Sequence, residues 1–548
     1  MRVFFLFFLS LTIGNLGAQV TPAQEQSIDS LFSVIGKDNK PGCVIGIMKE
    51  GKLIFSKGYG SANLDYNIPL TPESAFPIGG LSRQVTASCI GLLITQGKIQ
   101  LTDDIRKYIP ELPDFGTEVS IRSLVLHTSG IRDYFRLMDI TGADVNGYYD
   151  NDFVLKLIEQ VKGLNNKPGT EFILSNSNDL ILAELIRKVT GKTLPEFCRE
   201  NIFVPLGMDH TFFNEDCNQV LPSRATPYKR TSTGAFEQCL VNNDAYGDHG
   251  LVTTVSDFCK WDQNYYSQQV GGESLHKLLY SPSASSNGET ESYSFGNYFE
   301  KINGMKSLHL GGFGSGFKCD YYRFPDSKFS VVIFCNREDF TPARTVQLIS
   351  ELFLAPALFK QSALPPKEKI QSKTLESYAG TYQMNRAGIT VEILFLNDTL
   401  RMKGSQSGQE HLLLAFGKHS FRRADAGQIQ LLFLTDAHAK RKLEIQNDGN
   451  KALFTRIETA ALNDSLLSSF AGNYFSKELK VKYRIVHQGT ELIAYLPNGE
   501  SGKLRAGAKD ELNVQTDNLK FIRDSSGIIT GFMLDSGGNL GEVKFEKN

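Results

Sequence analysis

A serine followed three residues later by a lysine on a helix is one arrangement that performs acyl transfer. Both side chains then lie on one face of the helix, where the amine helps to remove the proton of the attacking hydroxyl. Such pairs occur at Ser274 with Lys277 and at Ser315 with Lys318. The first pair lies in a polar connecting region, and the second lies in a loop or strand rather than at a helix start. We therefore interpret both as coincidences.

The cysteines do not form a pattern that is typical of a metal site. None of them occurs in a CxxC or in a Cys/His cluster with zinc spacing, so we predict neither a metal nor another cofactor. Cys43, Cys89 and Cys335 lie in apolar runs, which favours buried thiols. Cys217 and Cys239 flank a polar stretch and could pair in an oxidising compartment, although the connectivity does not follow from one sequence.

The alternation of apolar runs and turns predicts the elements that would position a site. Residues 43–55 contain two apolar runs around a turn, which is typical of a β-hairpin. Residues 85–93 place apolar side chains on one helical face, and Gly97 ends that helix. Much later, residues 329–334 form an apolar strand that a helix follows. Strands at both ends of a helical middle predict an α+β fold, in which helices pack against one antiparallel sheet.

The last third of the chain contains an internal repeat. Residues 375–382 (LESYAGTY) recur 92 residues later as 467–474 (LSSFAGNY). Both copies are rich in short strands and turns, so we predict two all-β, barrel-like domains. The predicted organisation is a signal peptide at 1–18, the α+β domain at 19–360, a linker at 361–374 and β-rich repeats at 375–458 and 467–548.

The N-terminus has the pattern of a secretory signal peptide. Arg2 precedes an apolar run, and Ala18 is a small residue before a polar one, which predicts cleavage near Ala18. The run is shorter than the roughly 20 residues that span a bilayer, and we predict no transmembrane span elsewhere. We therefore expect an exported protein, periplasmic or extracellular. The net charge of -2 argues against a nucleic-acid partner, because phosphate binding relies on clustered positive charge.

Several motifs between residues 28 and 350 follow one another in the order of a known family. They are FPIGGLSRQVTA at 76–87, HTSGI at 127–131, FVPLGM at 203–208, GLVTT at 250–254 and HLGG at 309–312. This region resembles the β-lactamase-related serine hydrolases, which include class C β-lactamases, penicillin-binding proteins, D-aminopeptidases and esterase relatives. The resemblance implies their α+β fold. D-aminopeptidase-like members also carry two β-barrel domains after the hydrolase domain, in agreement with the repeat.

The resemblance implies three catalytic elements, and this sequence departs from each of them. At the Ser-x-x-Lys positions stand Gly80 and Arg83. Glycine has no side chain that could attack a carbonyl, and a guanidinium stays protonated and cannot act as a base. The tyrosine of Tyr-x-Asn, which passes a proton to the leaving group, is replaced by Leu174. The other pocket positions that the resemblance implies are Ser175, Asn176, His309, Gly311 and Gly312.

Groups beside these positions decide what chemistry could remain. Ser82 lies about 200° around the helix from Gly80, so we expect its hydroxyl to point away from the pocket. The backbone N–H groups of Gly80 and Gly312 would still serve as oxyanion donors. Arg83 has two interpretations that the sequence does not separate: it pairs with an anionic ligand group, or it forms a salt bridge with a structural carboxylate.

Three hypotheses for the function follow. The leading one is a catalytically impaired family member that binds a peptide-like or acyl ligand in the cell envelope. The second is an active hydrolase (D-aminopeptidase, carboxypeptidase or esterase-like) that uses a non-standard nucleophile or a water, with His309 or His249 as base. The third is a scaffold whose β repeats bind a protein partner. We interpret His127 as structural and His249 as a packed or exposed side chain, with a place in the cleft as the alternative.

Overall fold

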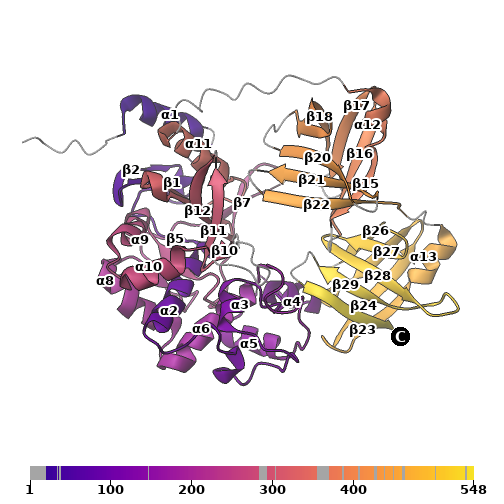
Figure 1. Ribbon diagram of the computed structural model, residues 1–548, viewed down its shortest axis with the longest axis horizontal. Coiled ribbons are helices and arrows are strands. Elements are labelled where there is room, and N and C mark those ends of the chain that lie inside the picture. The colour runs from indigo at the N-terminus through magenta and orange to yellow at the C-terminus, as the bar shows by residue number, and fades with distance from the viewer. Residues whose placement is uncertain are drawn as a thin grey trace, which may run out of the picture.

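The structure of the protein is a computed structural model that describes residues 20–354 and 370–548 (Figure 1). The predicted signal peptide and most of the predicted linker lie outside the described residues. None of the helices in the described ranges combines the length and the apolar character that a membrane span requires. Short gaps within these ranges lie at 34, 36–38, 146, 232, 283–292, 303, 385–387, 405–407, 425–428, 437–438, 448–449, 460–462, 500 and 537–539.

The first domain is built on a seven-stranded antiparallel sheet with the strand order β10-β11-β12-β13-β14-β1-β2. The predicted N-terminal hairpin joins the sheet beside the last strand, so that Val44 of β1 lies opposite Phe334 of β14. The α+β prediction is therefore confirmed. The strands are β1 (Cys43–Lys49), β2 (Lys52–Tyr59), β10 (Tyr293–Ser294), β11 (Asn297–Ile302), β12 (Met305–Gly314), β13 (Phe317–Phe324) and β14 (Phe329–Cys335).

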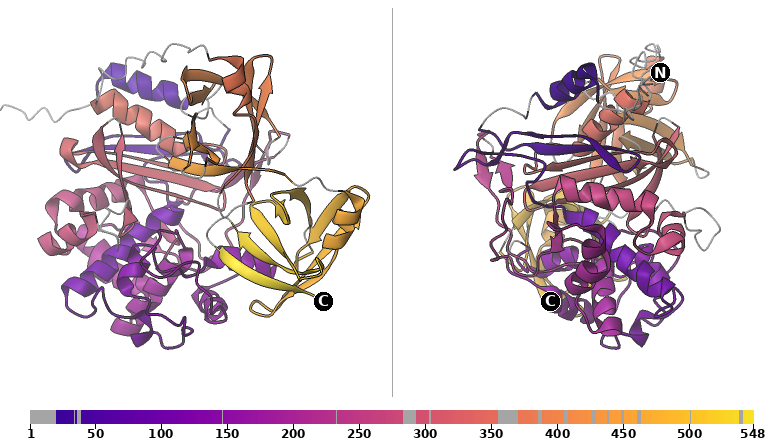
Figure 2. Two further views of the ribbon diagram at one scale, coloured as in Figure 1. Left: turned by 45° about the vertical axis from the view of Figure 1, so that its right-hand side comes forward. Right: turned by 90° about the vertical axis from the view of Figure 1, so that its left-hand side faces the viewer.

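Helices cover both faces of this sheet (Figure 2, left). Successive side chains of a strand point to opposite faces. Ile45 and Ile47 of β1 accordingly pack with α1 (Pro22–Phe32) and α11 (Pro342–Leu354), whereas Val44 packs into the larger helical layer. That layer contains α2 (Arg83–Thr95), α3 (Ile121–Val125), α4 (Tyr134–Thr141), α5 (Asn151–Glu159), α6 (Asn176–Thr190), α7 (Leu194–Cys198), α8 (Val204–Leu206), α9 (Val255–Ser267) and α10 (Gly272–Tyr280).

Short strands and turns connect these helices to the sheet. The most relevant is β9, which forms a small sheet with β5 and β6 and lies beside the start of α2. The short strands are β3 (Ser61–Asn63), β4 (Ile68–Pro69), β5 (Phe76–Pro77), β6 (Phe212–Phe213), β7 (Tyr228–Arg230), β8 (Phe236–Gln238) and β9 (Leu251–Thr253).

The cysteines correct two predictions. Cys43 and Cys335 lie directly opposite each other on β1 and β14 and form a disulfide, so the prediction of buried thiols was wrong for this pair. The two residues are 292 positions apart, and only the pairing of the terminal strands brings them together. Cys89 remains a thiol, as predicted. The suggested pairing of Cys217 with Cys239 was wrong, because both are free.

Each repeat folds into a closed eight-stranded barrel, which confirms the prediction of two all-β barrel-like domains. The first three strands of the two barrels pair in the same register, with Gly380 opposite Ile393 in the first barrel and Gly472 opposite Ile485 in the second. The first barrel contains α12 (Ser372–Glu376), β15 (Gly380–Met384), β16 (Thr390–Leu396), β17 (Thr399–Gly404), β18 (Glu410–Gly417), β19 (Ser420–Arg423), β20 (Ile429–Thr435), β21 (Arg441–Asn447) and β22 (Asn450–Ile457). The second contains α13 (Asp464–Phe470), β23 (Gly472–Ser476), β24 (Val481–Gln488), β25 (Glu491–Tyr495), β26 (Ser501–Ala506), β27 (Glu511–Val514), β28 (Asp517–Arg523), β29 (Ile529–Ser536) and β30 (Leu540–Lys547).

The second barrel packs against α4 of the first domain (Figure 1). Leu137 and Ile140 of α4 join the apolar core of this barrel. Just before α4, the Arg132 guanidinium lies 2.6 Å from the Glu478 carboxylate in the loop between β23 and β24. Arg132 directly precedes Asp133, whose carboxylate belongs to the candidate site described below. The second barrel therefore contacts the first domain beside that site.

Candidate functional site

Gly80 lies in the single turn of 3-10 helix (Gly79–Ser82) that leads into α2, at the position for which the resemblance implies a nucleophile. It is buried, and a Cβ added to it would overlap Nη1 of Arg83. The same Cβ position lies 3.3 Å from the carbonyl oxygen of Gly311 on β12. The guanidinium of Arg83 therefore fills the space in which a nucleophilic side chain would begin.

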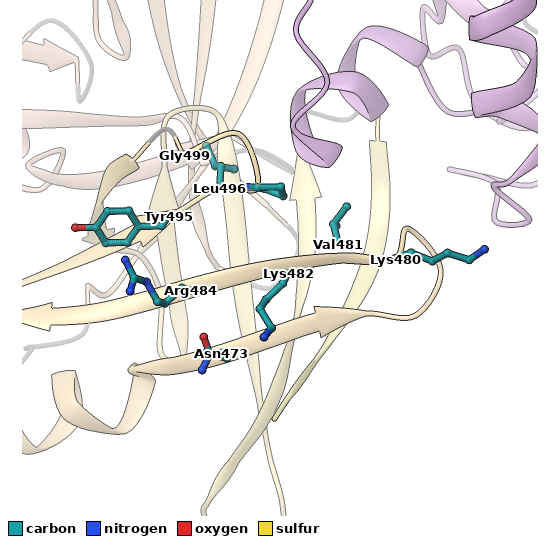
Figure 3. A pocket seen from close by; sticks show the side chains of 9 residues that line it. Asn473, Lys480, Val481, Lys482, Arg484, Tyr495, Leu496 and Gly499 are labelled. Atoms are coloured by element: carbon teal, nitrogen blue, oxygen red, sulfur yellow. The ribbon is translucent and has the colours of Figure 1, made fainter.

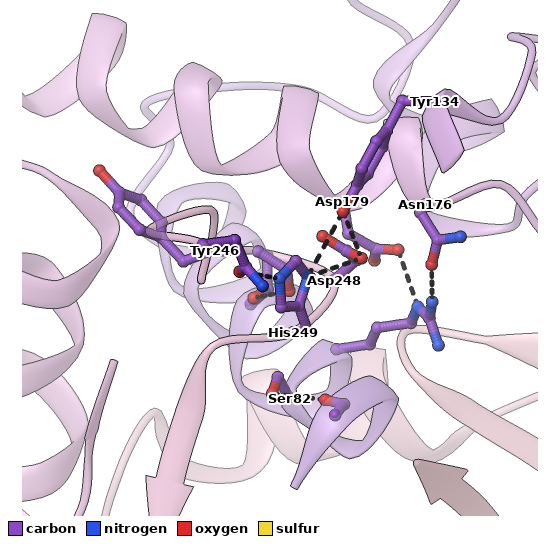
Figure 4. A network of polar contacts seen from close by, with 12 residues as sticks. Ser82, Tyr134, Asn176, Asp179, Tyr246, Asp248 and His249 are labelled. Carbon is purple, nitrogen blue, oxygen red and sulfur yellow. Dashed lines mark hydrogen bonds and ion pairs between the residues drawn. The ribbon is translucent and has the colours of Figure 1, made fainter. Parts of the chain in front are cut away.

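Arg83 is held in this place by two partners on α6 (Figure 4). Its Nε donates to Asp179 Oδ2 at 3.0 Å, and its Nη2 donates to Asn176 Oδ1. The Arg83 and Asp179 side chains are 9% and 4% exposed, so the ion pair is screened from water. Of the two interpretations of Arg83, the structure shows the salt bridge with a structural carboxylate.

The Asp133 carboxylate positions Asn176 and contacts the starts of two helices. Asp133 Oδ2 accepts from the backbone N–H of Asn176 at 2.7 Å and from its side-chain amide at 2.6 Å. Asp133 Oδ1 accepts from the backbone N–H of Arg136 at 3.2 Å. A carboxylate at a helix N-terminus satisfies free N–H groups and interacts favourably with the helix dipole. Asp133 thereby ties the start of α4 to the start of α6 and orients Asn176 toward Arg83.

A third buried carboxylate, Asp248, belongs to the same network of polar contacts (Figure 4). Its Oδ2 accepts from the Tyr134 hydroxyl at 3.1 Å and lies 2.9 Å from Nδ1 of His249. The other ring nitrogen of His249 lies 2.8 Å from Asn243 Oδ1. Both nitrogens of His249 are thus engaged with oxygen atoms, which supports the packed interpretation of this histidine.

Burial governs the protonation of these carboxyl groups. It raises the pKa of Asp179 to about 7, although the Arg83 charge opposes the shift. It also raises the pKa of Asp133, against the N–H groups that Asn176 and Arg136 donate. For Asp248, burial alone would raise the pKa, but His249, together with the Arg83 charge and the Tyr134 hydrogen bond, outweighs burial and the pKa is lowered. The Arg83 guanidinium therefore lies among three buried carboxyl groups, each of which would be ionised at neutral pH if it were exposed to water.

His127 has a structural role, as the sequence suggested. Its Nδ1 accepts from the backbone N–H of Ser175 and from the side-chain amide of Asn178, both at 3.1 Å. Its Nε2 lies 3.5 Å from Asp179 Oδ2. Burial, followed by the Arg83 charge, lowers the pKa of His127 well below its usual value. A neutral imidazole that donates from Nε2 fits all three contacts.

The strand side of the site is formed by β12 and β13. A Cβ on Gly312 would lie 2.8 Å from the backbone nitrogen of Gly80, so the two predicted oxyanion backbones are in contact. Gly311 lies opposite Asp320 on β13. His309 Nε2 lies 2.7 Å from Asp320 Oδ1, and its ring stacks on Tyr322 with the centroids 4.0 Å apart. His309 is thus paired with a carboxylate instead of facing the site as a free base.

The pairing of His309 predicts a pH-dependent contribution to stability. Burial acts to lower the pKa of His309, but the carboxylates of Asp320 and, to a smaller extent, Glu300 together outweigh it, so the pKa is raised. A raised histidine pKa stabilises the fold fully below the unfolded value of about 6.5, and this stabilisation is lost as the pH rises through the folded value. We expect Asp320→Asn to lower the free energy of unfolding by about 1.5–3 kcal/mol at pH 5.5 and by clearly less at pH 9.

Urea unfolding at the two pH values measures this effect. The chain has one tryptophan, Trp261, which is buried in the first domain, so its fluorescence reports the unfolding of that domain alone. The exposed Asp326, in the turn after β13, provides the matched control Asp326→Asn, for which no pH-dependent loss is expected. An equal loss for Asp320→Asn at both pH values would contradict the proposed protonation.

The side chains nearest to Gly80 that could replace a serine nucleophile are engaged elsewhere. The Ser82 hydroxyl donates to the Gly79 carbonyl at 2.6 Å and accepts from the Leu251 N–H at 3.2 Å, so it faces β9 as expected. The Cys319 thiol donates to the Ile78 carbonyl at 2.9 Å. Burial raises the pKa of this thiol well above its usual value, which keeps it in the protonated, weakly nucleophilic form.

The remaining predicted positions lie at the start of α6. Leu174 is half-buried and packs against the main core, so no proton-transfer group stands at the tyrosine position. The Ser175 hydroxyl is buried and has no hydrogen-bond partner among the described residues. Gly80, Arg83, Asn176, Gly311 and Gly312 are brought together, whereas His309 lies further along β12 and turns to Asp320.

The sequence interpretation missed the carboxylates of the site. Asp133 precedes α4 as its N-cap, and an aspartate before an amphipathic helix is a readable signal. Asp179 follows Asn176 by three residues, so both lie on one face of α6. The pairing of Asp248 with the adjacent His249 and that of Asp320 with His309 on the neighbouring strand were not predicted either.

Comparisons with known proteins identify the family of the chain. The Beta-lactamase family model matches residues 28–355. A D-aminopeptidase of Brucella anthropi is 26% identical over 516 residues, which cover 90% of this chain and 92% of that protein. A D-aminopeptidase of Brucella melitensis is 23% identical over 514 residues, covering 90% and 93%.

Solved structures show the same fold. An octameric penicillin-binding protein homologue from Pyrococcus abyssi has a TM-score of 0.54 and 20% identity, and the match covers 79% of this chain and 99% of that chain. A D-stereospecific amidohydrolase from Streptomyces has a TM-score of 0.50 and 17% identity, covering 60% and 98%. The fold is that of β-lactamases and penicillin-binding proteins. The chain belongs to the Beta-lactamase family, within the β-lactamase-related serine hydrolases that its motifs resemble.

Proposed function

We propose that this protein is a catalytically impaired member of its family that binds peptide-like or acyl ligands without forming a covalent intermediate. One observation carries the proposal: the guanidinium of Arg83 fills the space beside Gly80, where the nucleophile would stand, and is locked by Asp179 and Asn176. Acyl transfer needs an activated nucleophile at that point, and a protonated guanidinium is not one.

The engagement of the neighbouring groups supports the proposal against an unusual hydrolase. Ser82 and Cys319 donate to backbone carbonyls, and His249 and His309 are each paired with a carboxylate. None of these groups is poised beside Gly80 as a nucleophile with its base. Loss of a serine nucleophile costs roughly a factor of 10⁶ in turnover, which leaves binding as the principal residual property.

The relatives suggest the class of ligand. The named relatives include D-aminopeptidases and a D-stereospecific amidohydrolase, so amides of D-amino acids are the ligands to test first. Phe313 follows Gly312 on β12 and its side chain is 81% exposed. An exposed aromatic ring beside the retained backbone donors offers an apolar contact to such a ligand.

The predicted signal peptide and the Cys43–Cys335 disulfide support a periplasmic or extracellular location. In that location peptide-like ligands with D-amino acids would be within reach of the site. The location is tested by fractionating cells that produce the full chain and determining the N-terminus of the purified protein.

The first test is for covalent chemistry. We expect no adduct by intact-mass spectrometry after incubation of the unaltered protein with a fluorescent penicillin or a fluorophosphonate. A stable adduct with either reagent, or hydrolysis of D-alanine amide that is abolished by His309→Ala, would contradict the proposal.

The second test is for binding. We expect N-acetyl-D-alanyl-D-alanine to bind in isothermal titration, and Phe313→Ala to weaken its affinity by about tenfold, as expected for loss of one apolar contact. Val220 is 88% exposed and provides the control Val220→Ala, for which the affinity should not change. Equal weakening in both variants would remove Phe313 from the binding site.

A further inference from the structure

A hollow of about 520 Å³ lies on the outer surface of the second barrel (Figure 3). Strands β23, β24 and β25 form its floor, and the chain after β25 forms its rim. This rim touches the end of α4, since a Cβ on Gly142 would lie 2.9 Å from the Cβ of Pro497. The lining residues are Asn473, Lys480, Val481, Lys482, Arg484, Tyr495, Leu496, Pro497 and Gly499.

The charge of this lining has one sign. Lys480, Lys482 and Arg484 are basic, and the lining contains neither aspartate nor glutamate. Within the described part of the chain, none of the three forms an ion pair. Arg484 instead lies over the Tyr495 ring, with its guanidinium carbon 4.6 Å from the ring centroid. Positive charge with no compensating carboxylate attracts anions.

Several other basic side chains on the same barrel have acidic partners. Lys477 lies 2.5 Å from the Glu546 carboxylate, and Arg523 lies 2.8 Å from the Asp510 carboxylate. Lys503 pairs with Glu491 in the same way. These pairs show that the barrel surface carries carboxylates that compensate cations, whereas the lining of the hollow contains none.

The first barrel provides an internal comparison, since the first three strands of the two barrels pair in the same register. In the second barrel Arg484 lies opposite Asn473 on one side and Tyr495 on the other. In the first barrel the same position is Glu392, between Thr381 and Lys403. The barrel fold therefore does not require a cation here.

The position two residues before Arg484 on β24 also carries a cation that the first barrel lacks. Lys482 corresponds to Thr390 in the first barrel, at the same offset of 92 residues as the repeat. Lys482 and Arg484 are alternate residues of β24, so both side chains leave the same outer face, about 7 Å apart along the strand. Two cations at that spacing suit a ligand with more than one anionic group.

We propose that this hollow binds a multivalent anion that carries phosphate or carboxylate groups, with Lys482 and Arg484 as its main contacts. The guanidinium of Arg484 is oriented by stacking on Tyr495 and offers paired N–H donors, while the two lysines contribute mobile point charges. Lys480 belongs to the loop in which Glu478 binds Arg132, so the hollow is held in a defined place against the first domain.

The test uses inorganic tripolyphosphate and citrate as separate probes with the full chain at low ionic strength. We expect at least one probe to bind in isothermal titration, and its affinity to fall as salt is raised from 50 to 200 mM. The double variant Lys482→Thr with Arg484→Glu, which installs the residue types of the first barrel, should lower that affinity by about tenfold or more. Binding of tripolyphosphate alone indicates a phosphate ligand, and binding of citrate alone a carboxylate ligand.

The matched control is Lys509→Glu with Lys520→Thr, which makes the same change in charge at exposed positions outside the hollow. We expect this variant to keep the affinity within about twofold, and both variants to unfold at the temperature of the unaltered protein, since the changed side chains are exposed. Absence of binding by both probes, unchanged binding by the double variant, or equal loss in the control would overturn the proposal.

Discussion

The triple variant Gly80→Ser, Arg83→Lys, Leu174→Tyr is expected to form a covalent adduct with a fluorescent penicillin at least about 10³ times faster than the unaltered chain. The substitutions return a nucleophile, a smaller amine in place of the guanidinium, and a proton-transfer group to the start of α2 and α6. The backbones of Gly80 and Gly312 are already in contact, and Asn176 is already held by Asp133. Backbone oxyanion donors survive a change of side chain, so the altered chain should regain acylation.

The change at position 80 must be combined with the change at position 83, because the two positions are in contact. Gly80→Ser alone would place its Cβ against Nη1 of Arg83, which Asp179 and Asn176 prevent from moving away. We expect this single variant to lose about 1–3 kcal/mol of stability and to form no adduct. Adduct formation is followed by in-gel fluorescence and intact mass. A folded triple variant that forms no adduct would show that other parts of the pocket have also diverged.

The second large effect is expected from Arg83→Ala, which should lower the free energy of unfolding of the first domain by about 3–5 kcal/mol. The change leaves the buried Asp179 carboxyl without its ion partner. It also removes the donor to Asn176. Loss of the guanidinium raises the pKa of Asp179 further. At low pH this buried carboxyl is therefore neutral, whereas at high pH it must carry a buried and unpaired charge. The defect should therefore be larger at pH 9 than at pH 6.

Two further variants distinguish loss of the ion pair from a nonspecific loss of stability. In the double variant Arg83→Ala, Asp179→Leu no buried charge remains, so we expect a substantial part of the lost stability to return. Arg230 is 57% exposed and lies 3.9 Å from Asp339, so Arg230→Ala should cost less than about 1 kcal/mol. Urea unfolding followed by Trp261 fluorescence measures all three, since Trp261 Nε1 donates to Gln84, the residue next to Arg83. A loss for Arg83→Ala no larger than that for Arg230→Ala would contradict the assigned role.

The second barrel shows how little of the domain arrangement is visible in the sequence. The repeat at an offset of 92 residues predicts two similar barrels, but it contains no signal for where either one packs. That position depends on Leu137 and Ile140 of α4 and on the pairing of Arg132 with Glu478. Arg132 and Glu478 are 346 residues apart, and neither segment by itself indicates the other as its partner.

Local patterns were sufficient for the fold class and the family, and the predicted replacement of the catalytic positions rests on them too. Alternation along β1 and the helical periodicity of α2 are properties of neighbouring residues, and the identity of Gly80, Arg83 and Leu174 is visible wherever their motifs are recognised. The chemical consequence that glycine cannot attack a carbonyl also follows from residue type alone.

Only the tertiary structure decided which side chains the key residues pair with. Cys43 and Cys335 become a disulfide because the terminal strands pair, and Arg83 meets Asp179 rather than a ligand because α2 and α6 pack together. The physical reason is the same in both cases. A side chain's type is written in the sequence, whereas its charge state, its partner and the space it fills depend on groups that folding brings from far along the chain.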